Sequence, residues 1–286
     1  MTIAIIGTGN MGGAIMRGLI KSGTCRPEEI ICTAKSTATL DKIRAYDARI
    51  GVSCDNAAAA AKADIVVLAV KPWLVESVMQ EIRPNLKLDK QIIVSVAAGV
   101  ALRDLVEYAE PEYNIIEINR ICAEAEGREP QLPETFCEPV IFRVIPNTAV
   151  EALCGVTLIA HHGASEEQAE QIRLLFAALG YALILDEKLI PAGTALASCG
   201  IAFAMRYIRA AMEGGVELGF RPEEAARIVE HTVKGAATLL LESGAHPETE
   251  IDKVTTAGGI TIKGLNAMER AGFTSAVIDG LKATGL

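Results

Sequence analysis

Aromatic side chains are scarce in this sequence, at 4% of its 286 residues. Hydrophobic residues nevertheless make up 50% of the chain, so alanine, isoleucine, leucine and valine must fill the interior. That supply of apolar side chains is sufficient for one large domain or two modest ones. A core of small aliphatic side chains favours close contact between helices, and between helices and a sheet.

Positive charge is also in deficit, since 27 lysines and arginines stand against 36 aspartates and glutamates, a net charge of −9. An acidic surface argues against nucleic acid as a partner. Charged residues interrupt the apolar stretches before they reach the length of a bilayer, and the apolar segment from Thr2 has no basic residues before it. We therefore expect neither a membrane partner nor a signal peptide.

Cysteine and histidine lack the spacings that bind metals or form disulfide frameworks. The seven cysteines are odd in number, and no two of them stand as C-x-x-C. The four histidines belong to no nucleophile or metal-ligand pattern. These absences exclude the common zinc sites and predict a cytoplasmic protein with reduced thiols and no bound metal.

Apolar runs and amphipathic segments alternate along residues 1–187. This alternation predicts an α/β domain with a Rossmann-like, doubly wound, mostly parallel sheet and helices on both faces. Residues 108–139 interrupt the pattern because they are rich in glutamate and proline, and we interpret them as an insertion with a helix at about 115–124. The expected strands are residues 2–6, 29–33, 64–70, 91–96, 140–144, 156–160 and 182–185.

Residues 188–286 have an all-helical pattern. The first helix, at residues 189–218, is apolar nearly all round, so it must be buried on every face. One copy of this small helical domain has too few other helices to cover every face of that helix. We therefore predict a homodimer interlocked through the C-terminal helices.

The strongest functional motif joins the first strand to the first helix. Gly7 allows a tight turn, Gly9 lets a pyrophosphate approach the backbone, and Gly12 lets helix and strand pack closely. Free N–H groups at the helix start favour the phosphates. The alternative is a purely structural turn. The flanking strand and helix favour a dinucleotide site.

The end of the second strand bears on which dinucleotide binds. NAD enzymes usually carry an acidic residue there for the ribose 2′-hydroxyl, whereas this sequence has Lys35 and Ser36. A cation beside hydroxyl groups suits a 2′-phosphate, so we expect NADPH to be preferred over NADH. The alternative is a solvated lysine followed by a helix cap.

Two further turns are placed to bind ligands. Lys71 and Pro72 follow the strongest strand at the carboxyl edge of the sheet, where open α/β sheets bind ligands. Residues 255–261 place two glycines and flanking threonines before a helix, which makes an anion cradle suited to a substrate carboxylate. An ordinary loop lysine and an ordinary helix cap are the respective alternatives.

Several of these segments together resemble the pyrroline-5-carboxylate reductase family, in family order and over nearly the whole chain. They are Ile-Gly-Thr-Gly-Asn-Met-Gly (residues 6–12), Ala-Asp-Ile-Val-Val-Leu-Ala-Val-Lys-Pro (63–72), Ser-Val-Ala-Ala-Gly (95–99), Ile-Pro-Asn-Thr (145–148), residues 235–247, and Val-Thr-Thr-Ala-Gly-Gly-Ile-Thr-Ile-Lys-Gly-Leu (254–265). The resemblance implies NAD(P)H-dependent reduction of the cyclic imine 1-pyrroline-5-carboxylate to L-proline in proline biosynthesis. It also implies a helical dimerisation domain, and in some members a larger ring of dimers.

The resemblance also assigns site residues. It implies that Thr261 is catalytic, because its hydroxyl hydrogen-bonds the ring nitrogen, and that Asn56 approaches the adenosine ribose. A cyclic imine is readily protonated and then needs positioning more than a strong acid. The predicted substrate-binding residues are Thr256, Gly258, Gly259, Ile260 and Thr261. The predicted cofactor-binding residues are Gly7, Gly9, Asn10, Met11, Gly12, Lys35, Ser36, Asn56, Ala69, Val70, Lys71 and Pro72.

The sequence departs from the family pattern mainly at residues 197–203, where Ala-Ser-Cys-Gly-Ile-Ala-Phe replaces Ser-Gly-Ser-Gly-Pro-Ala-Tyr. Further departures are Ala149, Ala257 and the extra length of residues 108–139. Two alternatives therefore stay open: a reductase of another cyclic imino acid, and a non-catalytic NADP-binding sensor. A β-hydroxyacid dehydrogenase is disfavoured, because residues 189–218 contain no lysine to act as acid and base.

Overall fold

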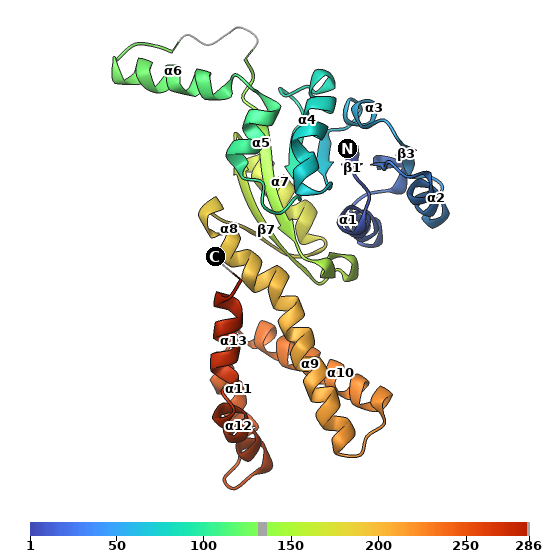
Figure 1. Cartoon of the computed structure of the whole chain (residues 1–286), viewed down its shortest axis with the longest axis vertical. Helices are drawn as coiled ribbons and strands as arrows, with labels where there is room; N and C mark the ends of the chain where they lie inside the picture. The colour runs from blue at the N-terminus through green and yellow to red at the C-terminus, as the bar shows by residue number, and fades with distance from the viewer. Residues whose placement is uncertain (131–135, 285–286) are drawn as a thin grey trace. The chain divides into compact units, whose positions relative to one another are not determined.

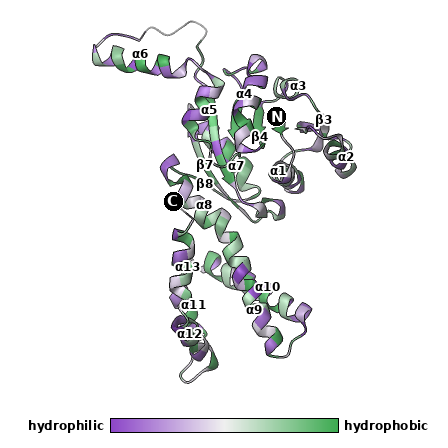
Figure 2. Ribbon diagram, in the orientation of Figure 1, coloured by the Kyte–Doolittle hydropathy of each residue, from purple (hydrophilic) through white to green (hydrophobic). Residues whose placement is uncertain are grey.

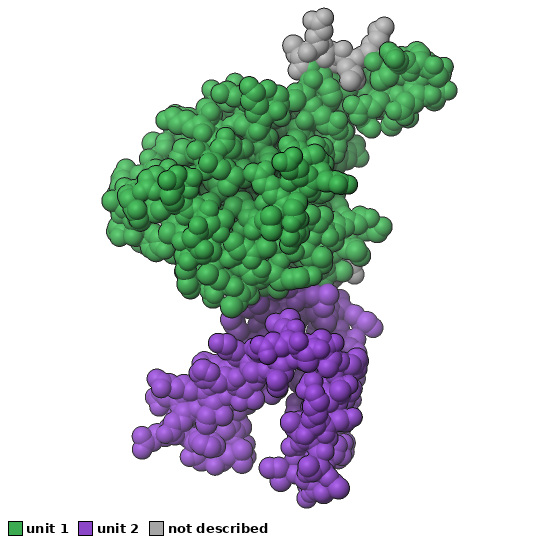
Figure 3. All heavy atoms as spheres, turned by 180° about the vertical axis from the view of Figure 1, so that it is seen from behind, with its two compact units in different colours: residues 1–194 green, residues 195–286 purple. Residues whose placement is uncertain are grey.

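The computed structural model describes residues 1–130 and 136–284. The chain divides into two compact units, Met1–Thr194 and Ala195–Leu286, which Figure 3 draws in different colours. We call them unit 1 and unit 2.

Unit 1 is built on one sheet of eight strands in the order β3-β2-β1-β4-β5-β6-β7-β8 (Figure 1). Neighbouring strands are parallel except β6 and β7, which are antiparallel. The strand order reverses between β1 and β4, as in doubly wound folds. The strands are β1 (Ile3–Ile6), β2 (Ile30–Thr33), β3 (Gly51–Ser53), β4 (Ile65–Leu68), β5 (Ile92–Ser95), β6 (Val140–Pro146), β7 (Gly155–His162) and β8 (Gly180–Ile184).

Helices cover both faces of this sheet, and each face has its own apolar core. Along β1, Ile3 and Ile5 contribute to one core, and Ala4 and Ile6 to the other, because successive side chains of a strand point to opposite faces. The first core is covered by α1 (Asn10–Lys21), α2 (Thr37–Tyr46) and α7 (Glu166–Ala177). The second is covered by α3 (Asn56–Ala60), α4 (Val75–Ile82), α5 (Leu102–Ala109) and α8 (Ile190–Thr194).

Local sequence signals explain where several of these helices begin. The Ser165 hydroxyl accepts a hydrogen bond from the backbone N–H of Gln168, and the backbone N–H of Ser165 donates to Gln168 Oε1, a capping box for α7. Asp55 caps α3 through the backbone N–H of Ala58 at 2.9 Å. Short 3₁₀ helices occur at Pro27–Glu29, Pro72–Leu74, Arg83–Asn85, Thr148–Ala152 and Glu187–Leu189.

The predicted insertion at residues 108–139 contains the helix α6 (Tyr113–Ala125), close to the expected 115–124. Residues 131–135 of that insertion lie outside the described residues. The apolar side chains of α6 divide between two faces, since Ile116 is buried while Ile115 and Ile118 are exposed.

One carboxylate ties three elements of unit 1 together. Oε1 of Glu187 accepts hydrogen bonds from Arg143 Nη1 on β6 and from the backbone N–H of Leu102 at the start of α5, both at 2.7 Å. The side chains of Arg143 and Glu187 are 12% and 32% exposed, so the ion pair is largely shielded from water. Glu187 lies in the 3₁₀ helix directly before α8, so these hydrogen bonds fix that segment to the sheet.

We expect Glu187→Ala to lower the free energy of unfolding by about 2 kcal/mol, because it leaves a nearly buried guanidinium and a backbone N–H without their acceptor. Glu187→Gln keeps an acceptor oxygen and is expected to cost about half as much. Urea denaturation of the two variants checks this, and equal stability of Glu187→Ala and the unaltered protein would contradict it.

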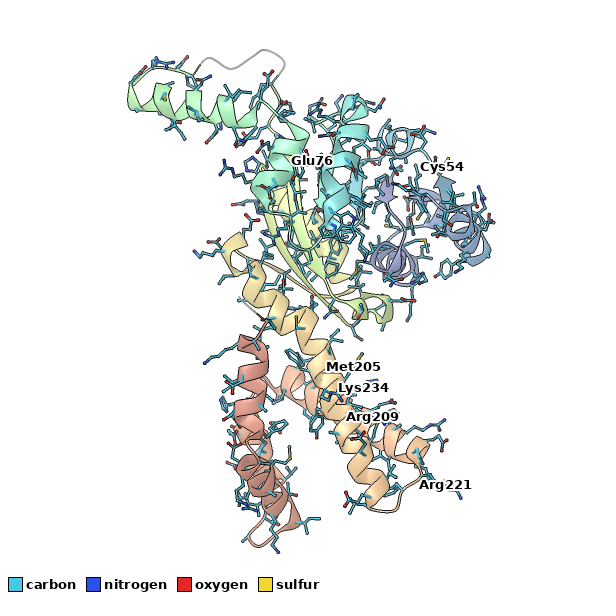
Figure 4. All side chains as sticks on the ribbon, viewed as in Figure 1. Cys54, Glu76, Met205, Arg209, Arg221 and Lys234 are labelled. Carbon is cyan, nitrogen blue, oxygen red and sulfur yellow. The ribbon has the colours of Figure 1, made fainter. Side chains whose placement is uncertain are left out.

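Unit 2 consists of helices and buries very little of its own surface. Its elements are the π-helical turn Ala195–Cys199, α9 (Gly200–Glu217), α10 (Pro222–Ser243), α11 (Pro247–Lys253), α12 (Ile260–Arg270) and α13 (Phe273–Lys282). Among its described residues, only Ala195 and Ala225 are buried. Figure 2 colours stretches of these helices as hydrophobic, and Met205, labelled on α9 in Figure 4, is 61% exposed.

The long helix predicted at residues 189–218 is divided in the structure, because the π-helical turn Ala195–Cys199 separates α8 from α9. Glu187–Glu217 is the one span among the described residues with the length and composition of a membrane-crossing helix, and 11% of the qualifying window is buried. This span carries Arg206 and Arg209, so it does not contradict the expectation that charged residues interrupt the apolar stretches. A helix covered by a second subunit meets the same criterion.

Candidate active site

A cavity of about 640 Å³ opens at the carboxyl ends of the central strands of unit 1. Its walls come from the turns that follow β1, β2, β4 and β5, at the point where the strand order reverses. The lining residues are Gly7, Thr8, Gly9, Asn10, Met11, Ala34, Lys35, Ser36, Thr39, Ala69, Val70, Lys71, Pro72, Leu74, Val96, Ala97 and Ala98. None of them is acidic, whereas two are lysines.

The three glycines of the first turn have the separate roles that their spacing predicts. Gly7 has a φ of +91°, a conformation that side chains disfavour. A Cβ on Gly12 would stand 2.5 Å from the carbonyl oxygen of Gly7, so any side chain there pushes α1 off the turn. A Cβ on Gly9 would meet nothing within 4 Å, because Gly9 faces the open cavity. Protein atoms therefore fill the space behind the turn, at Gly12, whereas the space in front of it, at Gly9, is open cavity.

The start of α1 has no side chain to accept its free N–H groups, since its N-cap is Gly9 and makes no side-chain hydrogen bond. These donors lie at the edge of the cavity. A pyrophosphate would supply the missing acceptors and would benefit from the helix dipole. The residues present therefore fit a dinucleotide.

Ten of the twelve predicted cofactor-binding residues line the cavity, and Gly12 and Asn56 do not. Gly12 is placed for packing behind the turn. Asn56 instead hydrogen-bonds the side chains of Thr33 and Glu81. The sequence reasoning missed the lining residues Thr8, Ala34, Thr39, Leu74, Val96, Ala97 and Ala98.

Position relative to the strands was a usable signal for the missed residues. Val96, Ala97 and Ala98 follow β5 as Ala69 and Val70 follow β4, so the same edge argument applies to both turns. Trp73 stands between two lining residues, Pro72 and Leu74, and is 76% exposed.

In unit 2, the predicted anion cradle forms a tight turn before α12. The backbone N–H of Gly259 donates to the carbonyl of Thr256 at 2.9 Å, and Gly258 has a φ of +71°. Gly259 is the N-cap of α12 and makes no side-chain cap hydrogen bond. Ile260 and Thr261 follow it in exposed positions. Both α1 and α12 thus begin at a glycine that leaves the first N–H groups to another acceptor.

The atypical segment at residues 197–203 overlaps the end of the π-helical turn Ala195–Cys199 and the start of α9. Such turns inside α-helices occur often at functional sites. Ser198 Oγ is buried and has no hydrogen-bond partner among the described residues.

The histidines lie elsewhere in the fold. His161 and His162 end β7, away from the cavity's lining residues. Burial and the neighbouring His162 lower the pKa of His161 from its ordinary value, which favours the neutral imidazole. Within residues 1–130 and 136–284, no group of three His, Cys, Asp or Glu side chains is placed to hold a metal ion.

Comparison with known proteins assigns both halves of the chain. The family model described as pyrroline-5-carboxylate reductase dimerisation matches residues 187–285, and that described as NADP oxidoreductase, coenzyme F420-dependent, matches residues 2–99. Pyrroline-5-carboxylate reductase 2 of Dictyostelium discoideum is 34% identical over 98% of this chain and 89% of its own length. The chain belongs to the pyrroline-5-carboxylate reductase family.

Two further relatives give the extent of the similarity. Pyrroline-5-carboxylate reductase 1 of Dictyostelium discoideum is 35% identical over 98% of this chain, and the chain spans 48% of that relative's length. The crystal structure of the Plasmodium falciparum pyrroline carboxylate reductase with NADP bound superimposes with a TM-score of 0.80 at 22% identity, covering 99% of this chain and 95% of that one. This second likeness concerns the fold.

These findings confirm the expected family, the Rossmann-like fold with a helical second part, and the oxidoreductase class. The chain carries a domain that binds NAD(P) and a dimerisation domain. The dimerisation domain accounts for the exposed apolar side chains of unit 2, which a second subunit covers in a homodimer. The family is one of soluble enzymes.

Proposed function

We propose that this chain reduces 1-pyrroline-5-carboxylate to L-proline with NADPH, as a step of proline biosynthesis. The observation that carries the proposal is the likeness to reductase 2 of Dictyostelium discoideum over 98% of this chain, together with the dinucleotide cavity of unit 1. We propose residues 1–187 as the dinucleotide-binding domain and 188–286 as the domain for dimerisation and substrate binding. We place the enzyme in the cytoplasm, as a homodimer that can form a larger ring of dimers.

The division of chemical roles follows from the few polar groups present. When bound, NADPH supplies the hydride. The cavity residues hold the dinucleotide, with the amides at the start of α1 on its pyrophosphate and Lys35 and Ser36 on its 2′-phosphate. The N–H groups of Gly258, Ile260 and Thr261 bind the substrate carboxylate, while that of Gly259 closes the turn on Thr256. The Thr261 hydroxyl orients the ring nitrogen. Catalysis then rests on positioning, without a charged acid.

The direct test mixes purified protein, NADPH and 1-pyrroline-5-carboxylate and follows the loss of cofactor absorbance. We expect sustained turnover. Tight NADPH binding without turnover would contradict the proposal. It would favour a reductase of another cyclic imino acid or a non-catalytic NADP-binding sensor, candidates that the π-helical turn and the altered residues 197–203 bring into consideration.

We expect Lys35→Glu to weaken NADPH binding by about 30-fold and NADH binding by less than about threefold, because only NADPH carries the 2′-phosphate. Lys35 is exposed and lines the cavity. The matched control is Lys62→Glu, which makes the same charge change at an exposed position outside the cavity lining. Calorimetric titration measures both dissociation constants, and equal losses for the two dinucleotides would contradict the assignment of Lys35.

A further inference from the structure

A chain of three hydrogen bonds links the glycine turn to the far side of the sheet. The backbone N–H of Gly7 donates to Thr33 Oγ1 at 3.2 Å, and the Thr33 hydroxyl donates to Asn56 Oδ1 at 2.7 Å. Asn56 Nδ2 then donates to Glu81 Oε2 at 3.0 Å. Gly7 directly follows β1, and the other three residues come from the end of β2, the start of α3 and α4. They join segments that are distant in sequence.

The direction of this chain is fixed by the carboxylate at its end. An ionised carboxylate only accepts hydrogen bonds, so Asn56 must turn its NH₂ group toward Glu81 and its carbonyl toward Thr33. The Thr33 hydroxyl has a single hydrogen, which it must give to that carbonyl. Its lone pairs are then left for the N–H of Gly7. A side chain on α4 thereby decides how the hydroxyl beside the turn is oriented.

Thr33 holds the turn through its backbone as well. Its carbonyl accepts hydrogen bonds from the N–H of Gly7 at 3.2 Å, the N–H of Thr8 at 2.8 Å and the hydroxyl of Thr8 at 3.1 Å. Thr33 is 1% exposed, so these bonds are shielded from water. Thr33, the last residue of β2, therefore holds Gly7 and Thr8 in place by hydrogen bonds.

Asn56 does not line the cavity, and both ends of its amide group are engaged with protein partners. Its side chain thus links Thr33 to Glu81, and the ribose contact that the family resemblance implies stays a prediction.

We propose that Thr33, Asn56 and Glu81 are positioning residues for the dinucleotide, which hold Gly7 and so set the direction of the turn's free amides. This positioning role rests on one part of the proposed function, namely that a dinucleotide binds at the turn. In this arrangement Asn56 acts on the turn through Thr33.

The test is a double-mutant cycle read by calorimetric titration with NADPH and with NADH, without substrate. Thr33→Val keeps the shape of the side chain and removes the hydroxyl, and Asn56→Ala removes the amide. We expect each variant to weaken both dinucleotides by about fivefold. The double variant is expected to be no weaker than either single one, because both changes break the same chain. Independent, multiplied losses would overturn the proposal.

Three further variants separate positioning from stability. Thr33→Ser keeps the hydroxyl and is expected to restore binding to within about twofold of the unaltered protein. Glu81→Ala is expected to weaken binding by about threefold, since it frees the Asn56 amide to turn over. Asp55→Ala removes the cap of α3 and is expected to lower the melting temperature without changing either dissociation constant. A loss of affinity in Asp55→Ala as large as that in Asn56→Ala would overturn the proposal.

The same measurements keep this proposal distinct from the proposed function. Unaltered protein that binds neither dinucleotide would overturn both. Unaltered protein that binds NADPH but does not reduce the imine would overturn the proposed function alone. Additive losses in the cycle would overturn the positioning role alone.

Discussion

Replacing Gly9 by alanine is expected to weaken NADPH binding by about 100-fold, equal to about 2.7 kcal/mol, while leaving the fold intact. The new methyl group would stand in the open cavity, where no protein atom lies within 4 Å of it. The φ of Gly9 is −83°, a negative value that does not by itself require glycine. The methyl group would instead displace the pyrophosphate from the amides at the start of α1. Calorimetric titration and thermal denaturation of the same sample measure both effects.

Gly12→Ala provides the opposite control within the same turn. Its methyl group would press on the Gly7 carbonyl behind the turn, so it is expected to lower the free energy of unfolding by about 1–3 kcal/mol. Gly9→Ala should leave the melting temperature within about 1 °C. If Gly9→Ala and Gly12→Ala lost stability equally, or if Gly9→Ala kept its affinity, the assignment of the open and closed sides of the turn would be wrong.

Thr261→Ala is expected to lower kcat/KM for 1-pyrroline-5-carboxylate by about 100-fold, with the affinity for NADPH unchanged. The hydroxyl is proposed to orient the ring nitrogen, so its removal affects the reacting geometry and not the dinucleotide in unit 1. Steady-state kinetics at saturating NADPH measure the effect. Thr261→Ser keeps the hydroxyl and is expected to recover activity to within about tenfold.

Thr274→Ala is the matched control for this prediction. It removes a threonine hydroxyl from α13, where that hydroxyl donates to Glu269 Oε2 at 2.7 Å, outside the cradle. We expect kcat/KM to change by less than about twofold in this variant. An unchanged kcat/KM in Thr261→Ala would remove Thr261 from the mechanism, and a weaker affinity for NADPH would indicate a defect of folding or assembly.

Much of unit 1 could be predicted because most of its strands are continuous apolar runs, and several, such as β1 before Gly7 and β6 at Pro146, end at a glycine or proline. The same logic also reached most of the cavity, since residues directly after parallel strands meet at one edge. The helix α5 was missed although Leu102, Leu105, Val106 and Ala109 have helical spacing and are buried. This helical spacing was overlooked because α5 runs into the glutamate-rich insertion predicted at residues 108–139.

Other features depend on information outside a local pattern. β3 has three residues, too few for periodicity to register. The antiparallel direction of β7 follows from its short connection to β6, residues 147–154, because a parallel crossover needs a dozen residues or more. The hydrogen bonds of Asn56 to Thr33 and Glu81 join three separate elements, and no spacing rule relates those positions.

The scarcity of aromatic residues has a practical consequence at the cavity. Trp73 is the single tryptophan of the chain and stands exposed between Pro72 and Leu74, which line the cavity. Each subunit therefore carries one indole fluorophore beside the place assigned to the dinucleotide. Energy transfer from that indole to a reduced nicotinamide would report whether the dinucleotide is bound, without any added label. Trp73→Phe, which removes the indole, is the control for the remaining fluorescence.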